Sequence, residues 1–265
     1  MTRPVLYTCS LVLVAATAFG QAPSPAPQGS APAGRAGRAA QTPEEIAVRA
    51  RVQQERLLND WPNLARYRDQ NTPLAPGAPG EARVVFYGDS ITDGWGRLQG
   101  AFFPGKPYVN RGISGQTTPQ MLVRFRQDVV ALKPKVVVIL AGTNDIAGNT
   151  GPSTPEMIQD NFKSMVDIAK ANDIRIVLAS ILPASDYPWK PGLDPGPKIV
   201  ALNTWLKQYA ASRDLVYLDY YSAVVDGKLG MKPELASDGV HPTKAGYDIM
   251  APLAERAIAD ALRQR

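Results

Sequence analysis

The sequence has few of the residues that cross-link small proteins or hold metal ions, because its 265 residues include one cysteine and one histidine. A disulfide framework within one chain requires paired cysteines, so we expect none. The common structural zinc sites need four cysteine or histidine ligands, so we expect no such site either. We therefore expect neither disulfides nor structural zinc to stabilise this chain.

The sequence also lacks a large excess of positive or negative charge. The chain has 29 lysines and arginines against 24 acidic residues, a net charge of +5, and the two signs are mixed along the sequence. Nucleic-acid-binding proteins usually gather positive charge on one face, so we expect no nucleic-acid partner. With 45% hydrophobic and 20% charged residues, the composition is typical of a folded globular protein. Its length fits one medium domain with accessory segments.

The N-terminal apolar stretch, residues 5–19, is too short for a membrane span, because it has about 15 residues where a bilayer needs ~20. Arg3 precedes the stretch, and the small residues Ala18 and Gly20 stand third and first before the expected cleavage point, as in a secretory signal. Cys9 lies in the middle of the stretch, which does not fit a lipoprotein signal. We predict that residues 1–20 form a signal peptide cleaved after Gly20. The mature protein would be secreted or periplasmic, with no integral membrane span.

Composition divides the rest of the chain into three parts. Residues 21–41 are rich in alanine, proline and glycine and predict a disordered linker, because such a segment buries too little apolar area to order itself. The Thr-Pro-Glu-Glu sequence at 42–45 predicts a helix start, and the helix should run to about residue 59. We therefore expect a helical arm over 42–80 and the main domain over 81–265. The apolar residues at 61, 64 and 67 are expected to pack the arm onto that domain.

Within the main domain, short apolar runs alternate with amphipathic ones. The expected strands are 83–87, 135–140, 174–179 and 215–218, with a weaker candidate at 108–110. The expected helices are 118–132, 154–171, 197–211 and the segment from 243 to the end, where Pro252 should produce a kink. Continuous apolar strands suit a parallel sheet that is covered on both faces. The alternation predicts an α/β domain with helices around such a sheet.

Polar segments follow the predicted strands. Gly-Asp-Ser-Ile-Thr stands at 88–92, Asn-Arg-Gly-Ile-Ser-Gly-Gln-Thr at 110–117 and Gly-Thr-Asn-Asp at 142–145. A fourth segment, Asp-Gly-Val-His-Pro at 238–242, precedes the last helix. Ligands of open parallel sheets bind beyond the carboxyl ends of the strands, so these segments are expected to form a common site.

The residue types in these segments are suited to acyl transfer. A serine nucleophile such as Ser90 needs a base to take its proton, and His241 is the one histidine available. Asp238 lies three residues before His241, within reach to orient the imidazole. The oxyanion of an acyl-transfer intermediate needs fixed donors, which the N–H groups of Ser90 and Gly115 and the side-chain amide of Asn144 are placed to supply.

In content and order, the four segments resemble the sequence blocks of the SGNH (GDSL) hydrolases. The resemblance runs from residue 83 to the C-terminus and implies a flavodoxin-like, three-layer α/β/α sandwich with a five-stranded parallel sheet. It implies Ser90 as nucleophile, His241 as base and Asp238 as the orienting carboxylate. Gly115 and Asn144, with Ser90, would form the oxyanion hole. The expected activity is that of a serine esterase that uses no metal and no organic cofactor.

The other acids of these segments are expected to be structural. Asp89 and Asp145 are predicted to brace loops as hydrogen-bond acceptors. Asp93 is predicted to lie in solvent. None of the three is expected to take part in catalysis.

Substrate choice is predicted from three aromatic residues and from the lack of a long apolar insertion. Trp95 follows the serine segment, and Tyr187 and Trp189 lie in a proline-rich loop after a strand, so all three are candidate substrate-binding residues. No long apolar insertion is present that would form a deep acyl tunnel. We therefore expect short acyl esters, with acetyl esters of sugars or small alcohols favoured. The alternatives are a lysophospholipase or thioesterase of the same superfamily, or a non-catalytic carbohydrate-binding module on the same scaffold.

Overall fold

The computed structural model describes residues 42–74 and 80–264. The predicted signal peptide and linker, residues 1–20 and 21–41, lie outside the described residues. The chain divides into two units, Met1–Ile46 and Ala47–Arg265, and the account below concerns the second. No helix in the described part of the chain has the length and apolar character that a membrane span requires.

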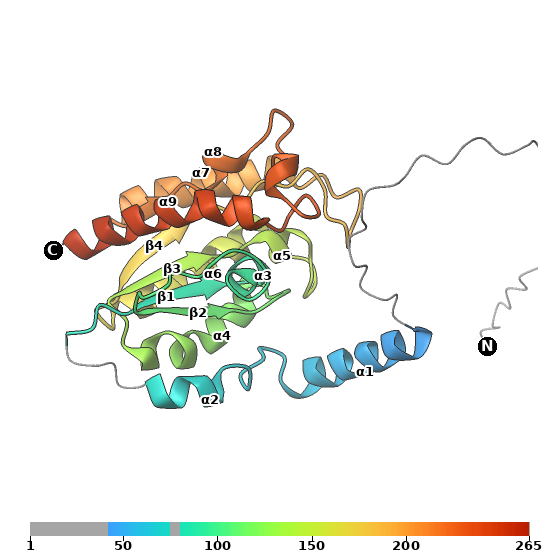
Figure 1. Cartoon of the computed structure of the whole chain (residues 1–265), viewed down its shortest axis with the longest axis horizontal. Helices are drawn as coiled ribbons and strands as arrows, with labels where there is room; N and C mark the ends of the chain where they lie inside the picture. The colour runs from blue at the N-terminus through green and yellow to red at the C-terminus, as the bar shows by residue number, and fades with distance from the viewer. Residues whose placement is uncertain (1–41, 75–79, 265) are drawn as a thin grey trace, which may run out of the picture. The chain divides into compact units, whose positions relative to one another are not determined.

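A five-stranded parallel sheet forms the centre of the domain, with strand order β2-β1-β3-β4-β5 (Figure 1). The strands are β1 Val84–Gly88, β2 Tyr108–Gly112, β3 Val136–Leu140, β4 Arg175–Ala179 and β5 Val216–Leu218. Every residue of β1 and β3 is buried, as expected for strands covered on both faces. The predicted sheet is confirmed, including the weaker candidate strand, which became β2.

Helices cover both faces of the sheet. The long helices are α4 Thr118–Asp128, α6 Pro155–Lys170, α7 Gly196–Ser212 and α9 Lys244–Arg263. Tyr87 shares an apolar cluster with residues of α4, α6 and α7, whereas Phe86 shares a second cluster with residues of α9. Neighbouring strand residues point to opposite faces, so the two clusters are the two sides of the sheet. The predicted three-layer α/β/α architecture is confirmed.

Short helices and turns connect these elements. They are α2 Arg68–Asn71, α3 Ser90–Gly94, α5 Thr143–Ile146 and α8 Tyr221–Val224, with 3-10 turns at Thr72–Leu74, Val130–Leu132 and Pro233–Leu235. Threonine caps begin two of the long helices: Thr154 accepts a hydrogen bond from the amide of Met157, and Thr243 from that of Gly246. The chain from 118 to 132 is α4 followed by a 3-10 turn, and Pro252 lies inside α9.

The arm begins with α1, Pro43–Asn59, and its later part packs onto the main domain. Tyr67 is 5% exposed, and its hydroxyl donates a hydrogen bond to the carbonyl of Gly112 at the end of β2. Two hydrogen bonds from α4 use backbone carbonyls of the arm: Gln120 Nε2 lies 2.7 Å from Trp61 O, and Gln127 Nε2 lies 2.7 Å from Leu64 O. The predicted packing is confirmed for Tyr67, whereas Trp61 is 38% exposed and contributes its backbone carbonyl.

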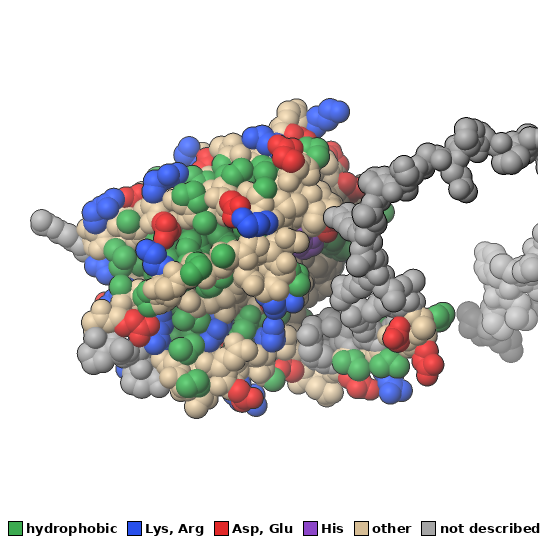
Figure 2. Space-filling model, in the orientation of Figure 1, with side chains coloured by type: hydrophobic (Ala, Val, Ile, Leu, Met, Phe, Trp, Pro, Cys, Tyr) green, Lys and Arg blue, Asp and Glu red, His purple; other side chains and the backbone are tan. Residues whose placement is uncertain are grey.

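The molecular surface carries both charge signs side by side. On the face that Figure 2 shows, lysines and arginines lie among aspartates and glutamates and do not gather into one patch. This arrangement agrees with the small net charge of +5.

Candidate active site

Two glycines let the carboxyl ends of the central strands approach the serine segment. A Cβ on Gly112, the last residue of β2, would lie 2.1 Å from the amide nitrogen of Asp93. A Cβ on Gly88, the last residue of β1, would lie 2.7 Å from the carbonyl oxygen of Leu140. Both distances are too short for any side chain. These positions therefore require glycine so that α3 can begin at Ser90 directly above the sheet.

The structure brings Ser90, His241 and Asp238 together from distant parts of the chain. Ser90 Oγ lies 2.9 Å from His241 Nε2, and His241 Nδ1 lies 2.8 Å from Asp238 Oδ2. A carboxylate only accepts hydrogen bonds, so Nδ1 carries the proton and Nε2 is left to accept one from the Ser90 hydroxyl. This tautomer is the one that general-base chemistry at Ser90 requires.

A single turn positions the carboxylate and the imidazole. Asp238 Oδ1 accepts hydrogen bonds from the backbone amides of Val240 at 3.0 Å and His241 at 2.8 Å, and Gly239 between them has a φ of +84°. Partial burial would raise the pKa of Asp238, but the hydrogen bonds from the backbone and ring of His241 outweigh it and lower that pKa. Asp238 is therefore ionised at neutral pH and holds the ring by charge as well as by geometry.

Gly115 and Asn144 line one cavity together with Ser90 and His241. Asn144 is the second residue of α5 and is 2% exposed; its Nδ2 donates to the carbonyl of Gln116 at 3.0 Å, and its Oδ1 accepts from Asn149 at 2.8 Å. An amide nitrogen has two hydrogens, so one remains for a ligand. Gly115 has a φ of +81°, the left-handed region that favours glycine.

Two cavities meet at the serine and histidine. The first, of about 220 Å³, is lined by Ser90, Ser114, Gly115, Asn144, Asn149, Trp189 and His241. The second, of about 340 Å³, is lined by Ser90, Gly94, Arg97, Leu98, Gln99, Ser114, Ser237, His241, Pro242 and Tyr247. Ser90, Ser114 and His241 belong to both sets. A substrate therefore has room on either side of the Ser90 hydroxyl.

Of the three predicted substrate-binding aromatics, only Trp189 lines a cavity at Ser90. It is 40% exposed, its Nε1 donates to Asn149 Oδ1 at 3.2 Å, and its ring lies 6.0 Å from that of His241. Tyr187 is fully buried and stacks beneath Trp189 at 5.0 Å. It supports the tryptophan from below.

Trp95 does not lie in the site. Its side chain is 3% exposed, packs against Phe86, Phe103 and Tyr247, and lines neither cavity at Ser90. The prediction from its position near Ser90 needs correction, because the chain turns its ring into the core at the end of α3.

The acids beside the site are buried. Asp89 caps α3 by accepting from the amide of Ile91 at 3.0 Å, and Asp145 accepts hydrogen bonds from the amide and hydroxyl of Thr118. Burial raises the pKa of each carboxyl to about 6. Their predicted loop-bracing role is confirmed. Asp93, which was expected in solvent, is 7% exposed and pairs with the guanidinium of Arg97 at 2.5 Å, so that prediction was wrong.

Sequence reasoning missed two buried polar residues that contact the site segments. Arg124 is fully buried and donates to the carbonyls of Gly88 at 3.0 Å and Arg111 at 2.9 Å. Gln116 is 3% exposed and accepts from Arg124 Nε at 2.5 Å. A signal existed in the sequence, since Arg124 stands at helical spacing among the apolar residues of the face of α4 that packs on the sheet.

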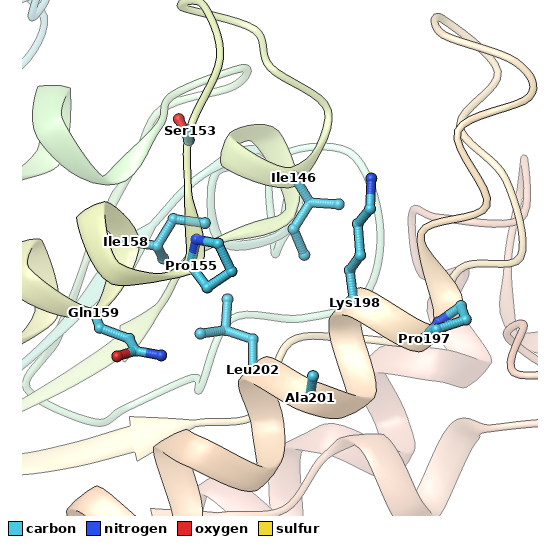
Figure 3. Close-up of a pocket in the computed structure, with 9 residues that line it drawn as sticks. All are labelled: Ile146, Ser153, Pro155, Ile158, Gln159, Pro197, Lys198, Ala201 and Leu202. Carbon is cyan, nitrogen blue, oxygen red and sulfur yellow. The ribbon is translucent and has the colours of Figure 1, made fainter.

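A further cavity, of about 390 Å³, lies away from these residues. It is lined by Ile146, Ser153, Pro155, Ile158, Gln159, Pro197, Lys198, Ala201 and Leu202, at the starts of α6 and α7 (Figure 3). None of the predicted site residues lines it. Over residues 42–74 and 80–264, no group of three or more histidine, cysteine or acidic side chains is arranged to hold a metal ion.

Comparison with known proteins identifies the family of this site. Residues 86–249 match the model of the GDSL-like Lipase/Acylhydrolase family. The chain belongs to this family. The match includes the Ser90 segment and the residues that meet it at the carboxyl edge of the sheet, and it confirms the resemblance seen in the sequence.

Relatives of known structure and name support the same assignment. A solved structure from Bacteroides fragilis is 46% identical, with a TM-score of 0.75 over 77% of this chain and 100% of its own. A GDSL-like lipase from Bacteroides thetaiotaomicron is 44% identical, with a TM-score of 0.73 over 76% of this chain and 100% of its own. An acetylxylan esterase from Geobacillus stearothermophilus is 28% identical over 64% of this chain and 90% of its own. The GDSL protein described here is a carboxylic ester hydrolase.

Proposed function

We propose that this GDSL protein hydrolyses short-chain acyl esters through an acyl-enzyme on Ser90, and that acetyl esters of sugars are its favoured substrates. The observation that carries the proposal is the 2.9 Å contact between Ser90 Oγ and His241 Nε2 at the junction of two small cavities. A hydroxyl that meets an oriented imidazole in an open pocket is the arrangement that nucleophilic catalysis requires.

In the first half of the reaction, Ser90 Oγ attacks the ester carbonyl while His241 Nε2 takes the hydroxyl proton. Ionised Asp238 stabilises the imidazolium that forms. The carbonyl oxygen becomes an oxyanion that accepts hydrogen bonds from the amides of Ser90 and Gly115 and from Asn144 Nδ2. His241 then gives its proton to the leaving alcohol, the bond from the carbonyl carbon to that oxygen breaks, and the acyl group remains on Ser90.

In the second half, water takes the place of the alcohol. His241 Nε2 removes a proton from the water, whose oxygen attacks the acyl carbon, and the same donors hold the second oxyanion. The bond to Ser90 Oγ breaks, His241 returns the proton to that oxygen, and the carboxylic acid leaves. Every proton transfer uses Nε2, so the tautomer fixed by Asp238 serves both halves.

The size of the site favours a short acyl group. The cavity beside Gly115 and Asn144, where the acyl carbonyl would lie, measures about 220 Å³ and opens to solvent beside Trp189. This space suits an acetyl group and not a fatty acyl chain. Trp189 presents an exposed indole ring at the rim, a surface suited to the apolar face of a sugar. The acetylxylan esterase relative supports the same substrate class.

We also propose that the protein acts outside the cytoplasm, because residues 1–20 have the pattern of a cleaved signal. N-terminal sequencing of the protein recovered from the periplasm or medium of a bacterial expression host is expected to begin at Gln21. Recovery of the uncleaved chain in the cytoplasm would contradict this part of the proposal.

Hydrolysis of p-nitrophenyl acetate by wild type and Ser90→Ala tests the mechanism. We expect a loss in kcat on the order of 10⁶, as for removal of a catalytic serine, with an unchanged melting temperature. Ser212→Ala is the control, because Ser212 is an exposed serine at the end of α7 that lines neither cavity at Ser90, and it should keep activity. Equal rates for wild type and Ser90→Ala would favour the binding module.

A series of p-nitrophenyl esters from acetate to palmitate, with acetylated xylooligosaccharides and lysophospholipid beside it, tests the substrate. We expect kcat/KM to be highest for acetyl esters and to fall with each added pair of carbons. A maximum at long acyl chains would favour the lysophospholipase or thioesterase alternative.

A further inference from the structure

We infer that Gln116 is a positioning residue that fixes Asn144 for the reaction by anchoring its loop to the N-terminal arm. The inference rests on the proposed function, in which Asn144 and Gly115 stabilise the oxyanion. It assigns a catalytic purpose to the arm, which otherwise lies outside the site.

The side chain of Gln116 forms hydrogen bonds in two directions. Its Nε2 donates to the carbonyl of Pro62 in the arm at 2.6 Å, and its Oε1 accepts from Arg124 Nε in α4 at 2.5 Å. Gln116 is 3% exposed and Arg124 is fully buried, so water does not replace these partners readily. The side chain therefore holds the loop between β2 and α4 against both the arm and the helix.

The backbone of the same residue contacts the proposed oxyanion donors. The carbonyl of Gln116 accepts from Asn144 Nδ2 at 3.0 Å, and its amide donates to the carbonyl of Ile113 at 3.3 Å across a turn that contains Gly115. The first bond directs one hydrogen of the Asn144 amide away from Ser90 and leaves the second for the oxyanion. The orientation of that donor thus depends on where the Gln116 carbonyl stands.

Arg124 connects this loop to the nucleophile and to the arm. It donates to the carbonyl of Gly88, two residues before Ser90, and pairs with buried Asp128 at 3.1 Å. Asp128 in turn accepts from Asn71 of the arm at 2.7 Å. The arm therefore holds the loop at two places, through Pro62 to Gln116 and through Asn71 to the buried ion pair.

An oxyanion donor contributes most when its position is fixed before the reaction, since no reorganisation is then needed. Loss of the Gln116 side-chain bonds frees the loop to shift, so the Gln116 carbonyl no longer fixes the orientation of the Asn144 amide. We expect a fall in kcat of about 10- to 100-fold, the size of effect that a displacement near 1 Å produces. KM should change much less, because the ground-state ester does not depend on the oxyanion donors.

The test replaces Gln116 and a matched glutamine by methionine, which keeps the length of the side chain and removes its hydrogen bonds. Gln127 donates to the carbonyl of Leu64, two residues beyond Pro62, at 2.7 Å and has no contact with the oxyanion loop. Both Gln116→Met and Gln127→Met lose a hydrogen bond to the arm, and Gln116→Met also leaves buried Arg124 without a partner for its Nε, so we expect the melting temperature to fall in both variants and further in Gln116→Met. Only Gln116→Met should lower kcat for p-nitrophenyl acetate.

A double-mutant cycle with Asn144→Ala separates positioning from general damage. If Gln116 acts through Asn144, Gln116→Met should cost less than threefold in kcat once Asn144 is alanine, because interacting sites are not additive. Affinity for a small alkylboronic acid, which forms a tetrahedral adduct with Ser90, should fall in Gln116→Met by the same factor as kcat.

Each result decides something. A Gln116→Met kcat within twofold of wild type, a full effect in the Asn144→Ala background, or an equal kcat loss in Gln127→Met would overturn the inference and leave the proposed function intact. If wild type and Ser90→Ala hydrolyse the ester equally, the proposed function fails and the inference fails with it. Should Gln116→Met not fold, Gln116→Glu, which keeps the acceptor for Arg124 and loses the donor to Pro62, takes its place with the same expected signs.

Discussion

The two halves of the site are built in opposite ways. Asp238 and His241 stand three residues apart in one surface turn, with side chains 40% and 33% exposed, and most of their hydrogen bonds lie within that turn. Asn144 and Gln116 are 2% and 3% exposed, and their bonds join the loop after β2 to α4, α5 and the arm. The proposed base half, Asp238 and His241, is a local motif, whereas the proposed oxyanion half, with Asn144 and Gln116, is a product of tertiary packing.

This difference determines what a mutation can do in each half. In the exposed turn, a change that keeps the backbone bonds alters the chemistry and leaves the fold alone. In the buried half, the same bonds hold the loops together, so chemistry and stability change at once. The predictions below test whether mutations in the exposed turn change kcat alone while mutations in the buried half change kcat and stability together. The first is the mutation expected to change kcat most and stability least.

Asp238→Asn is expected to lower kcat by about 10⁴-fold, because it favours the wrong tautomer of the histidine. Asp238 Oδ1 accepts from two backbone amides, and the asparagine oxygen must stay there to satisfy them. Its NH₂ group then faces His241 Nδ1 and forces the ring proton onto Nε2, which can no longer accept from Ser90. Steady-state kinetics and the melting temperature, which should barely move, check the prediction.

The control for that variant is Asp248→Asn, which also removes one exposed carboxylate near the start of α9. Asp248 pairs with Lys244 at 2.6 Å and has no contact with His241, so kcat should stay within twofold of wild type. A kcat for Asp238→Asn within tenfold of wild type would show that the turn orients the imidazole without the carboxylate.

Asn144→Ala is expected to lower kcat by about 10²- to 10³-fold, the usual loss of one oxyanion donor. In contrast to Asp238→Asn, it should also lower the free energy of unfolding by about 1–3 kcal/mol, because the carbonyl of Gln116 loses a buried partner. Kinetics and urea unfolding of the same preparation measure both quantities. A large kinetic loss with no loss of stability would contradict the division between the halves.

Asn172→Ala is the matched control. Asn172 donates to the carbonyl of Ile168 at an exposed helix end, so its removal deletes an amide hydrogen bond far from the proposed oxyanion. We expect neither kcat nor the unfolding free energy to change by an amount comparable with Asn144→Ala.

The same division explains what the sequence could predict. His241 and Asp238 are readable because their geometry follows from three residues of separation, and Ser90 because it stands two residues after a strong apolar strand. The sheet is readable for a related reason: continuous apolar runs such as that of β3, all of whose residues are buried, fit little else.

Contacts between distant segments could not be predicted in this way. Nothing in the neighbourhood of Gln116 or Arg124 shows that the first meets the carbonyl of Pro62 and the second that of Gly88. The prediction that Trp95 binds substrate was wrong for the same reason, since its distance from Ser90 along the chain does not say on which side of α3 its ring packs. Sequence separation predicts contacts within a turn, and packing decides those beyond it.

Asp89→Asn is expected to stabilise the protein at pH 8 by up to about 3 kcal/mol, since burial raises the pKa of Asp89 from 3.8 to about 6. The folded state then binds the proton more tightly than the unfolded state does. The contribution of Asp89 to the free energy of unfolding therefore falls as the pH rises from about 4 to about 6. Above pH 6 the buried carboxylate is ionised, and the full loss of stability persists. Asparagine avoids the buried charge and still accepts from the amide of Ile91.

Urea unfolding of wild type and Asp89→Asn between pH 4 and pH 8 measures this effect, and the difference should disappear at the acid end. Asp145→Asn is the contrasting variant. The pKa of Asp145 is also raised to about 6, but both of its carboxylate oxygens accept hydrogen bonds from Thr118. Asparagine has one acceptor oxygen, so this variant should be destabilised at pH 8. If the difference in unfolding free energy between wild type and Asp89→Asn did not depend on pH, ionisation of Asp89 could not be its cause.

Trp189 is the side chain that contacts both halves, and its removal should have the smallest effect. Its indole N–H donates to Asn149, which holds Asn144, and its ring lies 6.0 Å from that of His241. Trp189→Ala is expected to raise KM for acetylated xylooligosaccharides about tenfold, the order of cost of losing one stacking surface, and to change kcat for p-nitrophenyl acetate less than threefold. Trp189→Phe keeps a ring above Tyr187 and loses only the hydrogen bond, so it should retain most of the oligosaccharide affinity. If alanine and phenylalanine lower kcat for p-nitrophenyl acetate equally and leave KM for the oligosaccharide unchanged, the indole serves the oxyanion half through Asn149 and not the sugar.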